Sequence, residues 1–236
     1  YVRTDTLDYN SQFDINLSNL IYNGFIIGST YEYSFNSRAD DNKRKNNYYV
    51  SVIADIAGNS IGALMGTQTG EPPKQIFGSN FAQYAKLQVD GRYYHRINNQ
   101  TEWANRMIIG MGLPYGNSTT MPVVKQFYSG GSNSLRGFAS RLVGPGTFDG
   151  MNSNFIETQG DVKFEFNTEI RRKLYSFIHG AAFLDAGNIW LMRDNPKFPG
   201  GTFSKNFHRE LAVDVGLGLR FDFSILVLRL DFAGPI

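Results

Sequence analysis

The chain has no cysteine among its 236 residues. This excludes disulfide bonds, thiol catalysis and cysteine-based metal sites, and it leaves the cellular compartment open. A strong charge of either sign is also missing, because 23 basic and 21 acidic side chains leave a formal net charge of +2. The short basic tract at residues 43–45 has no interleaved aromatic residues. Neither feature favours a nucleic-acid partner.

Long apolar runs are missing as well. A helix that spans a bilayer needs about 20 consecutive apolar residues, whereas the run at residues 224–228 is soon interrupted by Arg229 and Asp231. We therefore expect no transmembrane helix. The sequence begins at Tyr1 with neither an initiating methionine nor a signal-like segment, so we expect that processing or truncation has removed the true start.

Residue patterns typical of catalysis are also lacking. His95, His179 and His208 fall on separate segments, and none has an acid or a serine at a recognisable spacing. The glycine-containing segments 66–74 and 216–221 lack the Lys-Ser/Thr pair and the strand-to-helix context of a phosphate-binding loop. We predict no metal site, no cofactor and no enzymatic activity.

The pattern that is present belongs to β-strands. Aromatic residues make up 14% of the chain, yet its mean hydropathy is only −0.30, a combination that suits strands with one apolar face. Apolar and polar residues alternate most clearly in segments 81–97, 161–175, 211–223 and 226–232. Weaker alternation at 13–20, 24–36, 48–57, 103–113 and 177–189 brings the total to about nine strands.

The lengths of the strands and connections indicate a membrane barrel. Several strands reach the roughly 9–11 residues that a transmembrane β-strand needs. Short connections at 98–102, 176 and 224 alternate with long ones at 59–80, 114–159 and 191–209, as periplasmic turns alternate with external loops in outer-membrane barrels. We expect a short helix at 59–66 in one external loop, and we interpret the charged segment 37–47 as a solvated periplasmic turn. Trp103 and Trp190, near strand ends, are expected to anchor the chain at the membrane interface.

An odd number of strands cannot close a bacterial barrel, which has an even number and must satisfy every strand edge within the lipid. We therefore expect an all-β chain in which residues 1–236 form the C-terminal portion of a larger transmembrane β-barrel domain in the bacterial outer membrane. The first strands, the last strand and any N-terminal periplasmic domains would lie outside this sequence.

Three motifs follow one another in the second half of the chain. The segment "GGSNSLRGF" carries an apolar-Arg-Gly-Phe tip formed by Leu135, Arg136, Gly137 and Phe138. The next strand carries the acid Glu169, and the strand after it carries a Phe-x-Asp-x-Gly motif at Phe183, Asp185 and Gly187. In this order the motifs resemble the C-terminal barrel of the BamA and TamA superfamily of outer-membrane assembly factors, also called the bacterial surface antigen family. The continuation of the first motif, "RGFASRLVGPG", and the C-terminal segment "LRFDFSILVLRLDF" most resemble the TamA-like lipoprotein branch of Bacteroidetes.

The resemblance implies an antiparallel barrel of about 16 strands whose long loop re-enters the lumen, where its arginine pairs with acids of the inner wall. Strand parity points the same way, because Glu169 lies on the polar side of its strand and Asp185 shares parity with Phe183 and Gly187. Both carboxylates are candidate partners for the guanidinium of Arg136, and the choice between them stays open.

The neighbours of Arg136 have expected roles too. Gly137 would allow a tight backbone bend, and Phe138 would cover the ion pair from water. Gly216 and Gly218 are interpreted as lumen-side positions where the barrel bends or another segment approaches closely.

The function implied by the resemblance is that of a non-enzymatic factor that inserts or translocates other proteins. Its partners would be outer-membrane lipid, unfolded outer-membrane or surface proteins as clients, and accessory assembly proteins. A two-partner secretion transporter, which shares the Arg-Gly-Phe loop, or a porin-type pore is the alternative. A barrel protease or lipase would require His179 or His208 beside an acid or serine at the external rim.

Overall fold

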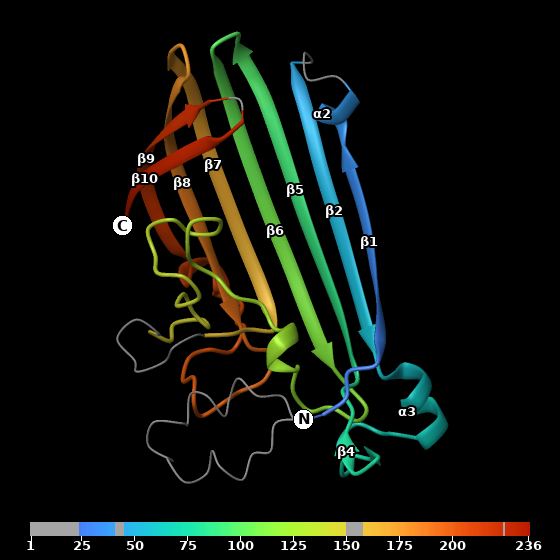
Figure 1. The fold of residues 1–236 in the computed structure, drawn as a ribbon. Helices are drawn as coiled ribbons and strands as arrows, with labels where there is room; N and C mark the ends of the chain where they lie inside the picture. Colours follow the sequence, from blue (N-terminus) through green and yellow to red (C-terminus); the bar gives the residue numbers. More distant parts are fainter. Residues whose placement is uncertain (1–23, 41–44, 150–157, 224) are drawn as a thin grey trace.

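The computed structural model describes residues 24–40, 45–149, 158–223 and 225–236. Eight strands form one antiparallel sheet in the order β1-β2-β5-β6-β7-β8-β9-β10, in which each strand pairs with the next one of the series along the chain (Figure 1). Their bounds are β1 Gly28–Asn36, β2 Asn46–Ala57, β5 Tyr84–Asn98, β6 Thr101–Pro114, β7 Val162–Tyr175, β8 Ile178–Trp190, β9 Ala212–Asp222 and β10 Val227–Pro235.

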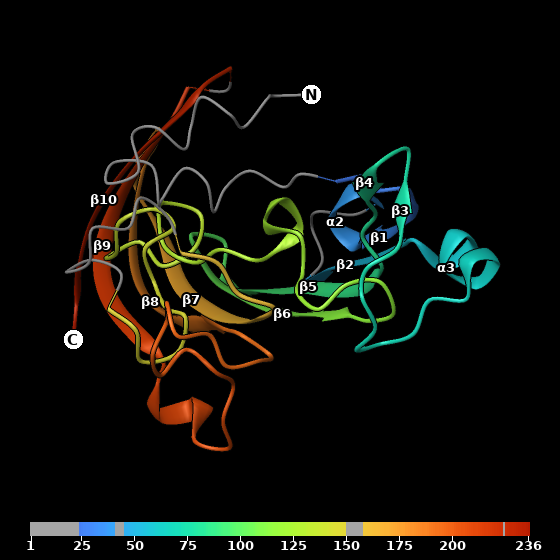
Figure 2. The ribbon, with the colours of Figure 1, turned by 90° about the horizontal axis from the view of Figure 1, so that it is seen from below.

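These strands confirm eight of the nine that the sequence predicts, and the ninth, at residues 13–20, lies outside the described residues. A second sheet of two short strands, β3 (Gln75–Ile76) and β4 (Ser79–Asn80), was not foreseen within the long connection 59–80. The large sheet is curved, and the described part of the connection between β6 and β7 lies on its concave side (Figure 2).

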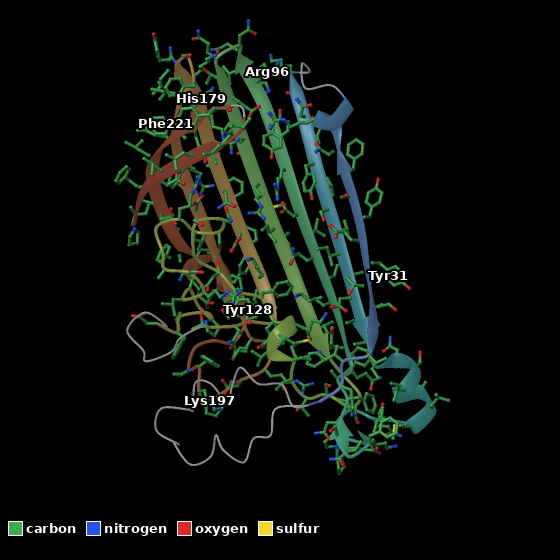
Figure 3. The ribbon with its side chains drawn as sticks, viewed as in Figure 1. Tyr31, Arg96, Tyr128, His179, Lys197 and Phe221 are labelled. Atoms are coloured by element: carbon green, nitrogen blue, oxygen red, sulfur yellow. The ribbon has the colours of Figure 1, made fainter. Side chains whose placement is uncertain are left out.

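The two faces of the sheet differ in chemistry, as the alternation predicts. Large apolar side chains on the convex face are strongly exposed; Tyr31, for example, projects from β1 with 67% of its surface accessible (Figure 3). Other exposed members of this face are Leu87, Met107, Ile109, Ile170, Leu217, Leu228 and Phe232. A continuous apolar face of this size is unfavourable in water and suits contact with lipid. The concave face carries most of the charged residues of the same strands, for example Lys86, Glu165 and Asp214.

The short and long connections gather at opposite ends of the sheet (Figure 1). The helix predicted at 59–66 is present as α3 (Asn59–Met65) and ends at Gly66, which has a left-handed φ of 59°. A second helix, α2 (Ser37–Asp40), begins the charged connection between β1 and β2 and was not predicted. Of the helices in the described residues, none has the length and apolar character needed to cross a bilayer. A small core of Ala57, Ala82, Tyr84 and Met121 lies where long connections meet strand ends.

The two tryptophans behave differently. Trp103 is 41% exposed, and its indole N–H donates to Thr168 Oγ1 at 2.8 Å. Trp190 is completely buried, because Phe203 and Phe207 of the connection 191–211 pack edge-on against its ring with centroids 5.5 and 6.1 Å away. The prediction of an interfacial anchor at Trp190 is therefore wrong, since a loop covers the ring.

Candidate functional site

The segment 129–138 forms a compact turn on the concave face of the sheet. The amide of Gly131 donates to the carbonyl oxygens of Leu135 and Phe138, both at 3.1 Å, and the amide of Ser134 donates to the carbonyl of Gly131 at 2.9 Å. Gly130 and Gly131 both have a φ of 98°, a left-handed conformation that side chains disfavour. We call this turn, residues 129–138, the tip segment. Its internal bonds present Arg136 to the inner wall of the sheet.

Arg136 meets Asp185 of β8 through three hydrogen bonds. Its Nε donates to Oδ2 at 2.7 Å, its Nη2 donates to Oδ1 at 2.8 Å, and its backbone amide donates to Oδ2 at 3.2 Å. The two side-chain bonds form the planar bidentate geometry that makes arginine–carboxylate pairs strong and specific. The side chain of Asp185 is fully buried and that of Arg136 is 7% exposed, so solvent screens this pair very little.

Two further groups complete the surroundings of the guanidinium. Its Nη1 donates to Glu169 of β7, and its Cζ lies 3.3 Å from the ring centroid of Phe183 of β8, in a cation–π contact. Burial alone would lower the pKa of Arg136, but the hydrogen bonds to Asp185 and Glu169 raise it above its ordinary value. Arg136, Glu169, Phe183 and Asp185 are called the Arg136 cluster below.

Glu169 belongs to a wider network of charges. Besides Arg136 it accepts hydrogen bonds from Arg171 Nε at 2.7 Å and from Arg220 Nη2 at 3.1 Å. Arg220 in turn donates to Asp231 of β10 at 2.6 Å. Glu169 therefore retains two cations if the side chain of Arg136 is removed. Asp185 retains no cation among the described residues and keeps neutral donors, Asn167 Nδ2 at 2.9 Å and the backbone amide of residue 136 at 3.2 Å.

The remaining sequence-predicted positions lie around this cluster. Leu135 is completely buried. Gly137 has no left-handed φ, so the expected tight bend is not the reason for a glycine there; a Cβ at this position would lie only 2.6 Å from the Cβ of Asp214 on β9. The ring that lies over the guanidinium is that of Phe183, while Phe138 closes the tip segment through its backbone. Gly187 faces Glu165 across the strand pair, where a Cβ would come within 2.9 Å of its side chain.

Several residues that hold the tip segment were missed by the sequence reasoning. Ser129 and Ser134 donate through their hydroxyl groups to the buried carboxylate of Glu165, the first of them at 2.8 Å. Four wall side chains also donate hydrogen bonds to backbone carbonyl oxygens of the loop. Lys163 donates to Tyr128, Arg106 to Asn133, Asn167 to Ser134 and Arg229 to Ser132. The inward parity of these wall residues was a signal available in the sequence.

Residues 28–236 match the model of the Omp85 superfamily domain. The chain belongs to the Omp85 superfamily. The predicted resemblance to the BamA and TamA superfamily is thereby confirmed. Among solved structures, this Omp85 chain is similar to BamA from Haemophilus ducreyi lacking POTRA domains 1–3, with a TM-score of 0.51 and 16% sequence identity. The match covers 89% of this chain and 50% of that one, so this chain spans about half the length of that BamA structure. At this identity the likeness describes the fold.

A barrel enzyme would require His179 or His208 beside an acid or a serine at the rim with the long loops. His179 lies near the end of the sheet that carries the short connections (Figure 3), away from the long loops. Within residues 24–40, 45–149, 158–223 and 225–236, no hydrogen bond or ion pair joins His179 or His208 to an acid or a serine, and no cluster of potential metal ligands occurs.

Proposed function

We propose that this chain is the C-terminal part of the barrel domain of a BamA- or TamA-like outer-membrane factor that inserts or translocates other proteins without enzymatic chemistry. Membership of the Omp85 superfamily and the BamA-like fold support this assignment. The domain would lie in the bacterial outer membrane, with its apolar convex face against lipid. Its clients would be unfolded outer-membrane or surface proteins, handled together with accessory assembly proteins. The branch that we propose is the TamA-like lipoprotein branch.

The Arg136 cluster is the observation that carries the proposal. An arginine 7% exposed, with a fully buried carboxylate on one side and an aromatic ring against its guanidinium, fixes the tip segment to two adjacent strands of the wall, β7 and β8. We propose that this cluster acts as a loop lock, which keeps the long connection inside the lumen while client strands are handled at the edges of the sheet.

A two-partner secretion transporter or a porin is the alternative. A steady pore requires an open lumen, whereas here the tip segment receives hydrogen bonds from β6, β7 and β10. This occupation of the lumen argues against an open porin-type pore, whereas a two-partner secretion transporter, which shares the loop, is separated from an assembly factor by the test below.

The test uses the full-length protein that contains this chain, reconstituted in proteoliposomes with a urea-unfolded small outer-membrane barrel as client. Folding of the client is followed by its heat-modifiable mobility on gels. We expect client folding to be faster than in empty liposomes and to slow in the Arg136→Ala variant, because the loop lock is lost. In planar bilayers the wild type should give small, fluctuating conductance. A large steady conductance without any effect on client folding would favour the pore.

A further inference from the structure

A polar cavity of about 420 Å³ lies on the concave face beside the tip segment. Its wall residues come from the halves of β5, β6 and β7 that lie nearer the short connections, and from Arg229 of β10. The cavity therefore lies between the tip segment and the end of the sheet that we assign to the periplasm. Its volume is within the range of roughly 300–1,000 Å³ that small-ligand sites have.

Positively charged groups outnumber negatively charged ones in the lining of the cavity. They comprise five arginines and one carboxylate, namely Arg92, Arg106, Arg136, Arg171, Arg229 and Glu169. The acids that pair with these arginines are mostly less exposed than the arginines themselves. Asp90 is 10% exposed, whereas its partners Arg92 and Arg106 are 36% and 28% exposed. The cavity surface is thus cationic, although the surrounding network contains many ion pairs.

Arg92 and Arg171 retain donors for a ligand, whereas Arg106 and Arg136 already have all three side-chain nitrogens engaged. A guanidinium has five N–H donors, and one carboxylate partner engages only some of them. Arg92 uses Nε and Nη2 for Asp90, and Arg171 uses Nε for Glu169 at 2.7 Å. Planar guanidinium groups around a partly enclosed space match carboxylate or phosphate groups, and low solvent access strengthens such contacts.

We propose that this cavity binds acidic side chains of a client polypeptide that enters the lumen from the end with the short connections. The polypeptide nature of the ligand rests on the proposed function, whereas the preference for carboxylates rests on the arginines alone. A lipid headgroup is a poor candidate, because the cavity lies on the concave face and the apolar face of the sheet is the opposite one.

Two substitutions remove cavity charge without leaving a buried acid unpaired. In Arg92→Gln, Asp90 keeps Arg106, whose Nη2 lies 2.9 Å away. In Arg171→Gln, Glu169 keeps Arg136 and Arg220. The matched control is Arg193→Gln, since Arg193 lies outside this cavity and donates from an exposed loop to the carbonyl of Thr119 at 2.6 Å.

The experiment measures fluorescence anisotropy of a labelled hexaglutamate peptide with the full-length protein in detergent at low salt. Hexaglutamine with the same label is the neutral comparison, and heat-modifiable mobility verifies that each variant is folded. We expect hexaglutamate to bind, the double variant Arg92→Gln/Arg171→Gln to bind about tenfold more weakly, and Arg193→Gln to match the wild type. Equal affinity in the double variant, equally tight binding of hexaglutamine, or binding of inorganic pyrophosphate without hexaglutamate would overturn the proposal.

The client-folding assay is run in parallel and separates this inference from the proposed function. Hexaglutamate binding in a protein that fails to accelerate client folding would overturn the proposed function and leave the acidic-peptide site standing. Normal client folding without hexaglutamate binding would overturn the site alone.

Discussion

The guanidinium carbon of Arg136 lies 3.3 Å from the ring centroid of Phe183. Phe183 reaches this position beside Gly216 of β9, where a Cβ would lie 2.3 Å from the tip of the phenylalanine ring. The glycine provides space for the ring, and the ring supports the arginine from below while Asp185 and Glu169 bind it in its plane. The loop lock therefore depends on three neighbouring strands, β7, β8 and β9.

Phe183→Leu should loosen the tip segment. The substitution keeps an apolar side chain but removes the π face, and a desolvated cation–π contact is worth about 2 kcal/mol. We expect amide hydrogen exchange at Gly131 and Phe138, whose amides close the tip segment, to accelerate about tenfold or more. The control is Phe166→Leu, the same change on the neighbouring strand β7 and on the opposite face of the sheet. Equal exchange in both variants would show that the ring does not support the arginine.

Arg136→Lys should loosen the tip segment almost as much as Arg136→Ala. Lysine keeps the charge but cannot form the bidentate pair with Asp185, nor reach Glu169 at the same time through a planar fork. The measurement is again amide exchange in residues 129–138. The control Arg92→Lys should leave this exchange unchanged, because Asp90 keeps Arg106. Wild-type exchange in Arg136→Lys would mean that charge alone holds the loop.

Gly137→Ala should displace the tip segment from β9. The new Cβ would lie 2.6 Å from the Cβ of Asp214 and 3.1 Å from the backbone of Gly234, and neither group can give way as a flexible side-chain end would. Overpacking of this kind costs about 1–3 kcal/mol. The control is Gly91→Ala on β5, where the backbone oxygen of Met107 would lie 4.0 Å from the new Cβ. The midpoint temperature of thermal unfolding of the folded barrel should fall for Gly137→Ala and stay unchanged for Gly91→Ala.

Ser129→Ala combined with Ser134→Ala should also release the tip segment, because the buried carboxylate of Glu165 loses both hydroxyl donors. Each such charge-assisted bond is worth about 1.5–3 kcal/mol. Ser132→Ala is the matched control, since the side chain of Ser132 is exposed and its contact to Arg229 uses the backbone carbonyl. Protease cleavage in residues 129–138 should increase only in the double variant. Cleavage at the wild-type rate would show that the two hydroxyl groups do not hold the segment.

Much of the large sheet could be predicted because period-two alternation reports directly on which face of a strand meets lipid. Shorter elements could not. Helix α2 depends on a tertiary contact, the ion pair from Arg38 to Glu102 at 3.0 Å. The prediction for Trp190 was wrong because no local pattern indicates that Phe203 and Phe207 pack over its ring.

The candidate site, like the fold, was predictable from the sequence only in part. Strand parity places Glu169 and Asp185 on one face from the sequence alone. That both contact one guanidinium depends on the path of the connection between β6 and β7, which no periodic pattern encodes. The sequence assigned no role to the serines of the tip segment, although two of them are hydroxyl donors to a buried acid.

The most direct test of the loop lock is a pair of double-mutant cycles on Arg136→Ala, one with Asp185→Asn and one with Glu169→Gln, with the free energy of loop opening measured by amide exchange in residues 129–138. Because Glu169 keeps Arg171 and Arg220 while Asp185 has no other cation among its described partners, we predict a coupling of about 2 kcal/mol for Asp185 and about 1 kcal/mol or less for Glu169. Additive effects of Arg136→Ala and Asp185→Asn, or a larger coupling to Glu169, would contradict the account.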